Sequence, residues 1–299
     1  MTGTEIARWA DVAMYAAKPT ERNKRSGLIE PQVTLTYMTD APLQRMAVPS
    51  ALYEGRVVHH YSEISQSYAL KWFDDMSNTV LEAPLEWIDF SFLFEGVTRA
   101  WMDQLLRQRT AVAVAESLRF SVKEDLEMEV VAPPSIAKLD EDDPRYVIWH
   151  EGVGHSHDTY TRLINAGIPA EDARGIIPLN TAVRVHYKTN LRNLVPHAGM
   201  RLCSQAQWEW KQVWHKMIQA IKAYGPEEDR WQQAEIVKLF KPICYQTGRC
   251  KFRASTDRFC SIRDRVEAHF RAGVPPELWH DIDPLEPVRE GAARKAPVQ

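Results

Sequence analysis

The segment that most constrains this chain covers residues 104–119. It reads Gln-Leu-Leu-Arg-Gln-Arg-Thr-Ala-Val-Ala-Val-Ala-Glu-Ser-Leu-Arg, which places three arginines beside an apolar run. A guanidinium is too costly to bury without a partner, and its planar fork of donors matches the oxygens of phosphate and carboxylate groups. The segment therefore predicts a fold in which these arginines line a cradle for an anionic ligand.

The composition limits the partners that such a chain can have. Its 299 residues are 44% hydrophobic, which is enough for a sizeable core. The net charge of -3 gives no general attraction for nucleic acid or for an anionic membrane. No apolar run approaches the roughly 18 residues that span a bilayer, and no signal-peptide stretch begins the chain. We therefore expect a cytoplasmic protein without nucleic-acid or membrane partners, which binds its anionic ligand locally.

The spacing of cysteines and histidines does not match common metal sites. The segment around His150 and His155 lacks the H-E-x-x-H spacing, and its two glycines indicate a polar loop before a helix. The cysteines lack paired C-x2-C spacing and are interpreted as unlinked packing thiols, although a metal site or a local disulfide stays open. They are Cys203, Cys244, Cys250 and Cys260. We predict no metal site.

The hydrophobic periodicity predicts a mixed chain of helices and strands. Residues 131–146, which contain prolines and an acidic run, are expected to form an exposed excursion. Residues 179–190 suit either a strand or a helix. Strands are predicted at 33–37 and 88–94, a connector or strand at 111–115, and helices at 43–51, 61–79, 97–109, 158–166, 169–173, 202–224 and 261–272.

Further arginines recur downstream of the first segment. Ordinary surface ion pairs would be the simplest interpretation of each group taken separately. Their order is more informative. It reads Arg107-Gln108-Arg109, seven residues, Ser117-x-Arg119, Ala-Arg174, Asn190-Leu-Arg192, and then Arg201, four residues and Ala-Gln-Trp-Glu. This order resembles the flavin-dependent thymidylate synthases, whose signature is Arg-His-Arg followed by seven residues and Ser, and the resemblance extends over roughly residues 33–225.

The resemblance implies an α/β (α+β) fold with a central sheet flanked by helices, in a homotetramer whose active sites form where subunits meet. Members of the family hold FAD, accept a one-carbon unit from methylenetetrahydrofolate, use NADPH to reduce the flavin, and convert dUMP to dTMP. The family domain would occupy residues 31–240, between an N-terminal arm at 1–30 and a C-terminal extension at 241–299.

The resemblance also implies roles for individual residues. Arg201 would bind the carbonyl edge of the pyrimidine, and Arg174 would reach the nucleotide phosphate from a neighbouring subunit. The other phosphate and nucleotide contacts would come from Gln104, Ser117 and Arg119. The cofactor would be held by Arg107, Gln108, Arg109, Glu86, Asn190 and Arg192. Those closest to the chemistry would be Arg201, Arg107 and Ser117.

The chain departs from the family pattern where the family has histidines. Gln108 replaces the central histidine of the signature, and Trp87 follows Glu86 where histidine is usual. Lost imidazoles remove groups that transfer protons near neutral pH. Three alternatives to dUMP methylation therefore stay open: a UMP methylase of a nucleoside-antibiotic pathway, a phage-type hydroxymethylase acting on dUMP or dCMP, and an inactive nucleotide-binding relative. Cys203 is the thiol to consider as a nucleophile, but no general base is evident beside it.

Overall fold

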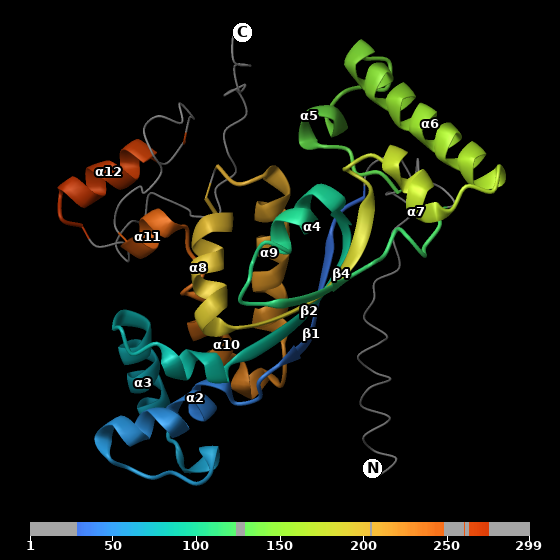
Figure 1. The fold of residues 1–299 in the computed structure, drawn as a ribbon. Helices are drawn as coiled ribbons and strands as arrows, with labels where there is room; N and C mark the ends of the chain where they lie inside the picture. The colour runs from blue at the N-terminus through green and yellow to red at the C-terminus, as the bar shows by residue number, and fades with distance from the viewer. Residues whose placement is uncertain (1–28, 124–128, 204, 248–259, 261–262, 275–299) are drawn as a thin grey trace. The chain divides into compact units, whose positions relative to one another are not determined.

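The computed structural model describes residues 29–123, 129–203, 205–247, 260 and 263–274 (Figure 1). Within these residues the chain groups into two compact units. The sheet unit consists of residues 31–116 and the described residues from 183 onward, and the insertion unit contains the described part of 117–182 together with residues 29 and 30. The predicted N-terminal arm lies almost entirely outside the described residues. The division at residues 30 and 240 stays a prediction.

A four-stranded sheet forms the centre of the sheet unit, with strand order β1-β2-β4-β3. Both β1 with β2 and β3 with β4 pair antiparallel. The backbone N of Leu191 donates to the carbonyl of Ile88 at 2.8 Å, so the end of β4 lies beside the start of β2 and this pair is antiparallel too. The strands are β1 (Gln32–Met38), β2 (Asp89–Thr98), β3 (Val112–Ala115) and β4 (Ala182–Asn190).

The strand predictions are confirmed, with corrections to their bounds. The segment 179–190, left open from the sequence, becomes strand β4. The strand predicted at 88–94 continues to Thr98 and includes Gly96, whose positive φ of 68° suits a residue without a Cβ.

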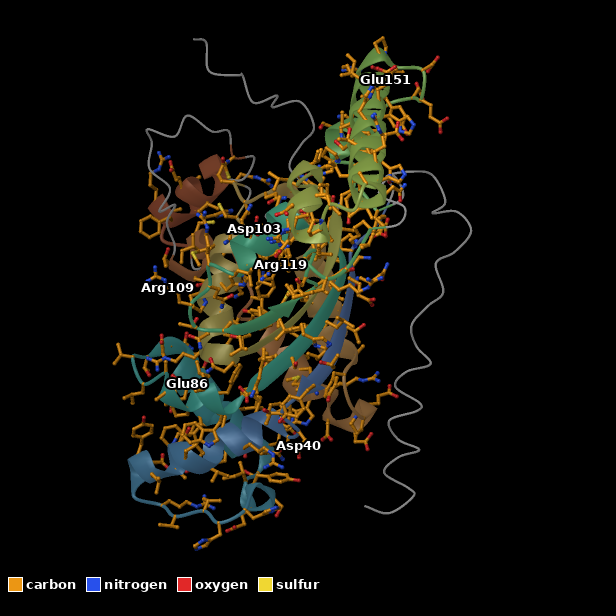
Figure 2. All side chains as sticks on the ribbon, turned by 45° about the vertical axis from the view of Figure 1, so that its right-hand side comes forward. Asp40, Glu86, Asp103, Arg109, Arg119 and Glu151 are labelled. Carbon is orange, nitrogen blue, oxygen red and sulfur yellow. The ribbon has the colours of Figure 1, made fainter. Side chains whose placement is uncertain are left out.

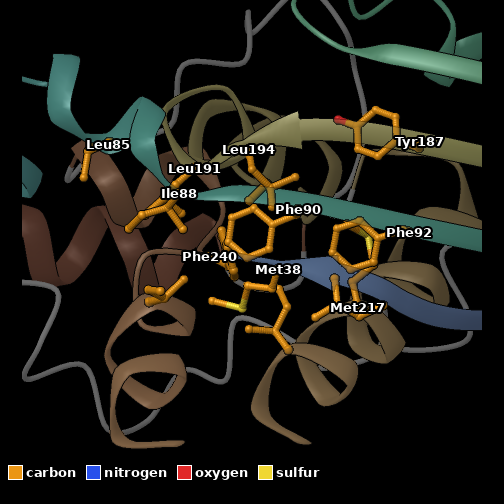
Figure 3. Packing of buried hydrophobic residues seen from close by; sticks show 14 of the residues in the cluster. Met38, Leu85, Ile88, Phe90, Phe92, Tyr187, Leu191, Leu194, Met217 and Phe240 are labelled. Carbon is orange, nitrogen blue, oxygen red and sulfur yellow. The ribbon is translucent and has the colours of Figure 1, made fainter. Parts of the chain in front are cut away.

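Alternate residues of β2 build the core of the sheet unit. Phe90, Phe92 and Phe94 point to the same side, are at most 1% exposed, and stack at ring-centroid distances of 6.2 and 5.8 Å. Met38 of β1 and Met217 of α9 belong to the same cluster (Figure 3). The period of two in Phe-Ser-Phe-Leu-Phe therefore selects the buried face of the sheet.

Helix α9 (Trp208–Ala223) packs against β1 on this buried side. Its buried residues Trp210, Val213, Trp214 and Met217 recur at helical spacing and form one apolar stripe. The other face of the sheet carries exposed side chains, with Arg184, His186 and Lys188 of β4 among them. The expectation of a sheet flanked by helices is thus correct for one face of the sheet unit, while on the other face these side chains meet solvent.

The remaining helices of the sheet unit follow the capping residues rather than the predicted bounds. Ser65 caps α3 and Thr98 caps α4, so the predicted helices at 61–79 and 97–109 begin later than expected. The helix expected from residue 202 starts at Trp208, and α8, which the sequence analysis did not predict, precedes it. These elements are α2 (Pro42–Ser50), η3 (Ala51–Glu54), η4 (Tyr61–Glu63), α3 (Gln66–Asn78), η5 (Ala83–Trp87), α4 (Arg99–Leu105), α8 (Leu191–Arg201), η7 (Glu227–Asp229), α10 (Arg230–Val237), α11 (Ile243–Thr247) and α12 (Arg263–Arg271).

The insertion unit is built around a long helix of which the sequence analysis predicted only the last part, at 158–166. The predicted loop at His150 to His157 is wrong, because α6 (Pro144–Asn165) runs straight through it. Asp143 caps this helix, and buried Val153 and Tyr160 anchor one side of it, which outweighs the cost of two glycines at about 1 kcal/mol each. The excursion predicted at 131–146 is therefore helical in part. The unit also contains α5 (Pro134–Ala137), α7 (Ala170–Ala173) and η6 (Arg174–Ile176). Among the described helices, α6 included, none has the length and apolar character needed to cross a bilayer.

The packing of β2 yields a stability prediction. Phe92→Ala removes a fully buried ring from the middle of the aromatic row, and we expect the free energy of unfolding to fall by about 3–5 kcal/mol in urea denaturation. Thr34→Ala, at an exposed position of β1, serves as the control and should stay within about 0.5 kcal/mol of the parent. Equal losses in both variants would contradict the assignment of the core face.

Candidate functional site

Arg201 is the last residue of α8 and its side chain is half-buried. Its Nη1 donates to Oε1 of Gln104 at 2.9 Å, and its Nη2 donates to the backbone carbonyl of Gln104 at 3.3 Å. The guanidinium carbon lies 4.6 Å from the ring centroid of Trp210, in cation-π contact. Gln104 of α4 and Trp210 of α9 thus fix the orientation of this guanidinium.

The side chain of Gln104 is held at both ends of its amide. Its oxygen also accepts a hydrogen bond from Nε1 of Trp210 at 2.9 Å, and its nitrogen donates to Oε1 of Gln207. An amide oxygen offers two lone pairs, and Arg201 with Trp210 occupies both. Gln104 therefore lies beside the predicted ring-binding arginine, with its carbonyl fully engaged.

Arg201 keeps donors that the described residues do not use. A guanidinium has five N–H donors and Gln104 takes two of them, which leaves three. One of these is Nε, which is buried and has no hydrogen-bond partner within the described part of the chain. Burial lowers the pKa of Arg201 below its ordinary value. A half-buried cation with unmatched donors is suited to bind a ligand acceptor such as a ring carbonyl.

Glu209 is fully buried and is connected to Gln104 through Gln207. Its carboxylate accepts from the backbone N of Thr98 and from the Thr98 hydroxyl, both at 2.6 Å, and from Nε2 of Gln207 at 3.3 Å. The same hydroxyl of Thr98 caps α4 by accepting from the N of Trp101. Burial raises the pKa of Glu209 to about 7 although the Thr98 hydrogen bonds oppose the shift. This carboxylate therefore ties the start of α4, the helix of Gln104, to the start of α9.

His197 is a buried histidine that the sequence analysis did not single out. Its ring packs at 5.1 Å from the ring of Trp210 and 5.8 Å from that of Trp214, and neither ring nitrogen finds a hydrogen-bond partner among the described residues. Burial lowers its pKa to about 3, with a smaller contribution from Arg201. It is a neutral packing residue and does not replace the missing family histidines as a proton carrier.

The loop after α4 presents the arginines of the first motif. Arg107 and Arg109, the latter labelled in Figure 2, are exposed and make no hydrogen bond or ion pair through their side chains to any described residue. Gln108 between them accepts from the Tyr187 hydroxyl at 2.6 Å. Burial raises the pKa of Tyr187, so the phenol remains a donor at neutral pH. Gln108 thus anchors the loop to β4 while both flanking guanidinium groups stay available.

Three other predicted cofactor residues lie near the junctions of η5, β4 and α8. Arg192 pairs with Glu86 at 2.6 Å and lies 3.6 Å from Glu82. The side chain of Asn190 caps α8 by accepting from the N of Asn193 at 3.1 Å. The structure therefore brings Glu86 and Arg192 together, and it gives Asn190 a capping role that local spacing alone could have suggested.

Two of the predicted phosphate residues of the insertion unit, Arg119 and Arg174, bind Glu171. Nε and Nη2 of Arg119 both donate to Oε2 of Glu171, at 2.9 and 2.6 Å, and Nε of Arg174 donates to the backbone carbonyl of Glu171 at 3.1 Å. The hydroxyl of Ser117 accepts from the N of Arg119 at 3.4 Å. Sequence reasoning missed Glu171, which holds Arg119 in the geometry that also suits a phosphate oxygen.

The described residues contain no cluster of three or more histidine, cysteine or acidic side chains that could hold a metal ion. Cys203, Cys244 and Cys260 are thiols that form no disulfide with one another, and Cys250 lies outside the described residues. The interpretation of the cysteine trio near the C-terminus therefore stays a prediction.

The burial of Glu209 predicts a pH dependence of stability. Its pKa rises from 4.5 in the unfolded chain to about 7 in the folded one, so the folded state holds a proton that the unfolded state has released. Between these values the contribution to the free energy of unfolding falls as pH rises, by up to about 3 kcal/mol. Measured by urea denaturation, the free energy of unfolding should therefore fall more between pH 5 and pH 8 for the parent chain than for Glu209→Gln. An identical loss in both proteins would refute this assignment.

Comparison with known proteins places these arrangements in a family. The family profile described as "Thymidylate synthase complementing protein" matches residues 35–227. The flavin-dependent thymidylate synthase of Pyrococcus furiosus is 32% identical over 228 residues, which cover 74% of this chain and 90% of that protein. The one from Pyrococcus horikoshii is 35% identical over 189 residues, covering 62% and 74% respectively.

A solved structure supports the same conclusion for the fold. The crystal structure of Thymidylate Synthase X from Helicobacter pylori with FAD and dUMP aligns with a TM-score of 0.52 and 18% sequence identity. The alignment covers 70% of this chain and 99% of that one. The chain described above belongs to the family of flavin-dependent thymidylate synthases.

Proposed function

We propose that this protein transfers a one-carbon unit from methylenetetrahydrofolate to carbon 5 of dUMP and releases dTMP, with FAD as its cofactor and NADPH as the reductant. The observation that carries the proposal is the guanidinium of Arg201, which is half-buried, oriented by Gln104 and Trp210, and left with unmatched donors. The named function of the relatives and the motif order around Arg201 support dUMP as the acceptor.

Arg201 suits the electronic demand of this reaction. When carbon 5 of the ring attacks the one-carbon unit, negative charge develops on the ring carbonyl oxygens. A fixed cation with free donors stabilises that charge without reorganising during the reaction. Carbon 5 forms a bond to the transferred carbon and loses its proton, and the bond from that carbon to the folate nitrogen breaks. A hydride that comes ultimately from NADPH reduces the transferred group to a methyl. Because Arg201 polarises the ring, the reaction does not require an enzymic thiol as a nucleophile.

The residues present are suited to hold a flavin dinucleotide. Arg107 and Arg109 are exposed guanidinium groups without protein partners in the described chain, which suits the pyrophosphate and the acceptor edge of a flavin. Gln108, Glu86, Asn190 and Arg192 would complete this cofactor site. FAD, when bound, supplies the hydride-transfer chemistry. The chain's own residues bind and orient the partners.

The insertion unit would supply the phosphate contacts. Arg119 is now paired with Glu171, and a phosphate carrying about two negative charges would compete effectively with a single carboxylate. Ser117 and Arg174 would add donors, with Arg174 acting in a neighbouring subunit of a homotetramer in the cytoplasm. Gln104 would serve the nucleotide through its contact with Arg201.

Substrate choice is tested by turnover with a panel of nucleotides. Anaerobic incubation of the FAD-loaded protein with NADPH, methylenetetrahydrofolate and dUMP, UMP, dCMP or CMP should give a mass increase of one methyl group with dUMP. A hydroxymethyl product, or preference for another nucleotide, would replace dUMP methylation by one of the alternatives left open from the sequence. Absence of any product with all four nucleotides would favour an inactive nucleotide-binding relative.

Removal of the Arg201 guanidinium is expected to abolish most turnover. Arg201→Ala should lower kcat/KM at least about 100-fold, equivalent to about 2.7 kcal/mol of transition-state stabilisation. Arg230→Ala, at an exposed arginine of α10, is the matched control and should retain the parent rate. A loss of less than about tenfold for Arg201→Ala would show that the guanidinium does not face the reacting ring.

A further inference from the structure

Four polar side chains form a continuous chain of hydrogen bonds that ends at Arg201, the residue proposed to bind the base. Glu209 accepts from Nε2 of Gln207, Oε1 of Gln207 accepts from Nε2 of Gln104, and Oε1 of Gln104 accepts from Nη1 of Arg201. We call Glu209, Gln207, Gln104 and Arg201 the amide relay. It connects the start of α9, the body of α4 and the end of α8.

The chemistry of the two ends determines the direction of every bond between them. An ionised carboxylate only accepts, so Gln207 must turn its NH2 group toward Glu209 and its oxygen toward Gln104. Gln104 must then turn its NH2 group toward Gln207 and its oxygen toward Arg201, which only donates. The indole N–H of Trp210 also only donates, and it binds the same oxygen of Gln104. A reversed amide at either glutamine would face donor against donor.

When Glu209 is ionised, its buried carboxylate supports this direction of the hydrogen bonds. The carboxylate is fully buried, and its hydrogen-bond partners among the described residues are three neutral donors, with no cation among them. A buried carboxylate is costly unless its hydrogen bonds are satisfied, so any rotation of Gln207 would leave an acceptor unmatched. The amide relay therefore resists alternative arrangements of the Arg201 guanidinium.

We propose that Glu209 and Gln207 are positioning residues that, through Gln104, fix the guanidinium of Arg201 for the base of the nucleotide. This inference rests on the proposed function for the identity of the base. Neither residue touches the substrate, and their contribution is to the orientation of Arg201. A competing role is purely structural, because Glu209 also binds Thr98 and so supports the cap of α4.

Affinity for two ligands separates the positioning role from the structural one. The FAD-loaded full chain is titrated at pH 8, where Glu209 is ionised, with dUMP and with deoxyribose 5-phosphate, which lacks the base. Gln207→Leu removes both relay contacts of a partly exposed side chain and leaves the Thr98 contacts of Glu209 in place. We expect this variant to bind dUMP about tenfold more weakly than the parent does. Its affinity for deoxyribose 5-phosphate should stay within about twofold of the parent value, and its Tm should be unchanged.

Glu209→Gln tests the end of the amide relay, and Glu235→Gln, at a carboxylate paired with Lys238 on α10, is its matched control. Glu209→Gln should lower the affinity for dUMP but not that for deoxyribose 5-phosphate, whereas Glu235→Gln should bind both ligands like the parent. If Glu209→Gln does not fold, Gln207→Leu decides alone. Unchanged affinity of Gln207→Leu for dUMP would overturn the proposal. An equal loss of affinity for both ligands together with a lower Tm would also overturn it.

A measurement on the ligand-free protein distinguishes failure of this inference from failure of the proposed function. The Trp210 indole N–H donates to Gln104, so its NMR resonance, assigned by its loss in Trp210→Phe, reports on the amide relay without any substrate. Gln207→Leu should shift this resonance even if the parent chain does not convert dUMP, and the positioning role would then stand for a different base. An unmoved resonance would refute the amide relay itself.

Discussion

The amide oxygen of Gln104 is shared by the Arg201 guanidinium and the Trp210 indole, and this contact joins α4 to the consecutive helices α8 and α9, which are distant from it in sequence. Trp210 lies 106 residues from Gln104, and Arg201 lies 97 residues from it. The contact exists only because Thr98 ends β2 and caps α4, while the aromatic face of β2 holds α9 against the sheet. The position of Arg201, the cation proposed to bind the pyrimidine, is thereby linked to the packing of the core.

The charged side chains of the two units have different kinds of partners. In the sheet unit, Arg201 is half-buried and Glu209 is fully buried, and both are held in one orientation by contacts with neutral groups: amides, a hydroxyl and an indole. In the insertion unit, Arg119 forms an exposed pair with Glu171, and such pairs contribute little to stability and exchange partners readily. The first arrangement suits a residue that must be fixed before the reaction, and the second suits one that must exchange a carboxylate for an incoming anion.

Periodicity and motif order predicted most of what is local. The alternation at Phe90 to Phe94 gave the buried face of β2, and the arginine motifs indicated the family that the comparisons then established. The part of α6 before residue 158 was missed because two glycines outweighed a cap at Asp143 that lay inside an acidic run. The partners of Arg201 and the pairing of Arg119 with Glu171 were out of reach, because spacing along a chain carries no signal for contacts between elements 50 to 100 residues apart.

The most direct measurement is a crystal structure of the protein loaded with FAD and dUMP. The account predicts that Nε or a remaining Nη hydrogen of Arg201 donates to a ring carbonyl of dUMP at about 3 Å. In the same structure Gln104 should still bridge Arg201 and Trp210. An Arg201 side chain released from Gln104, or a pyrimidine bound with its carbonyl edge away from this guanidinium, would contradict the central claim.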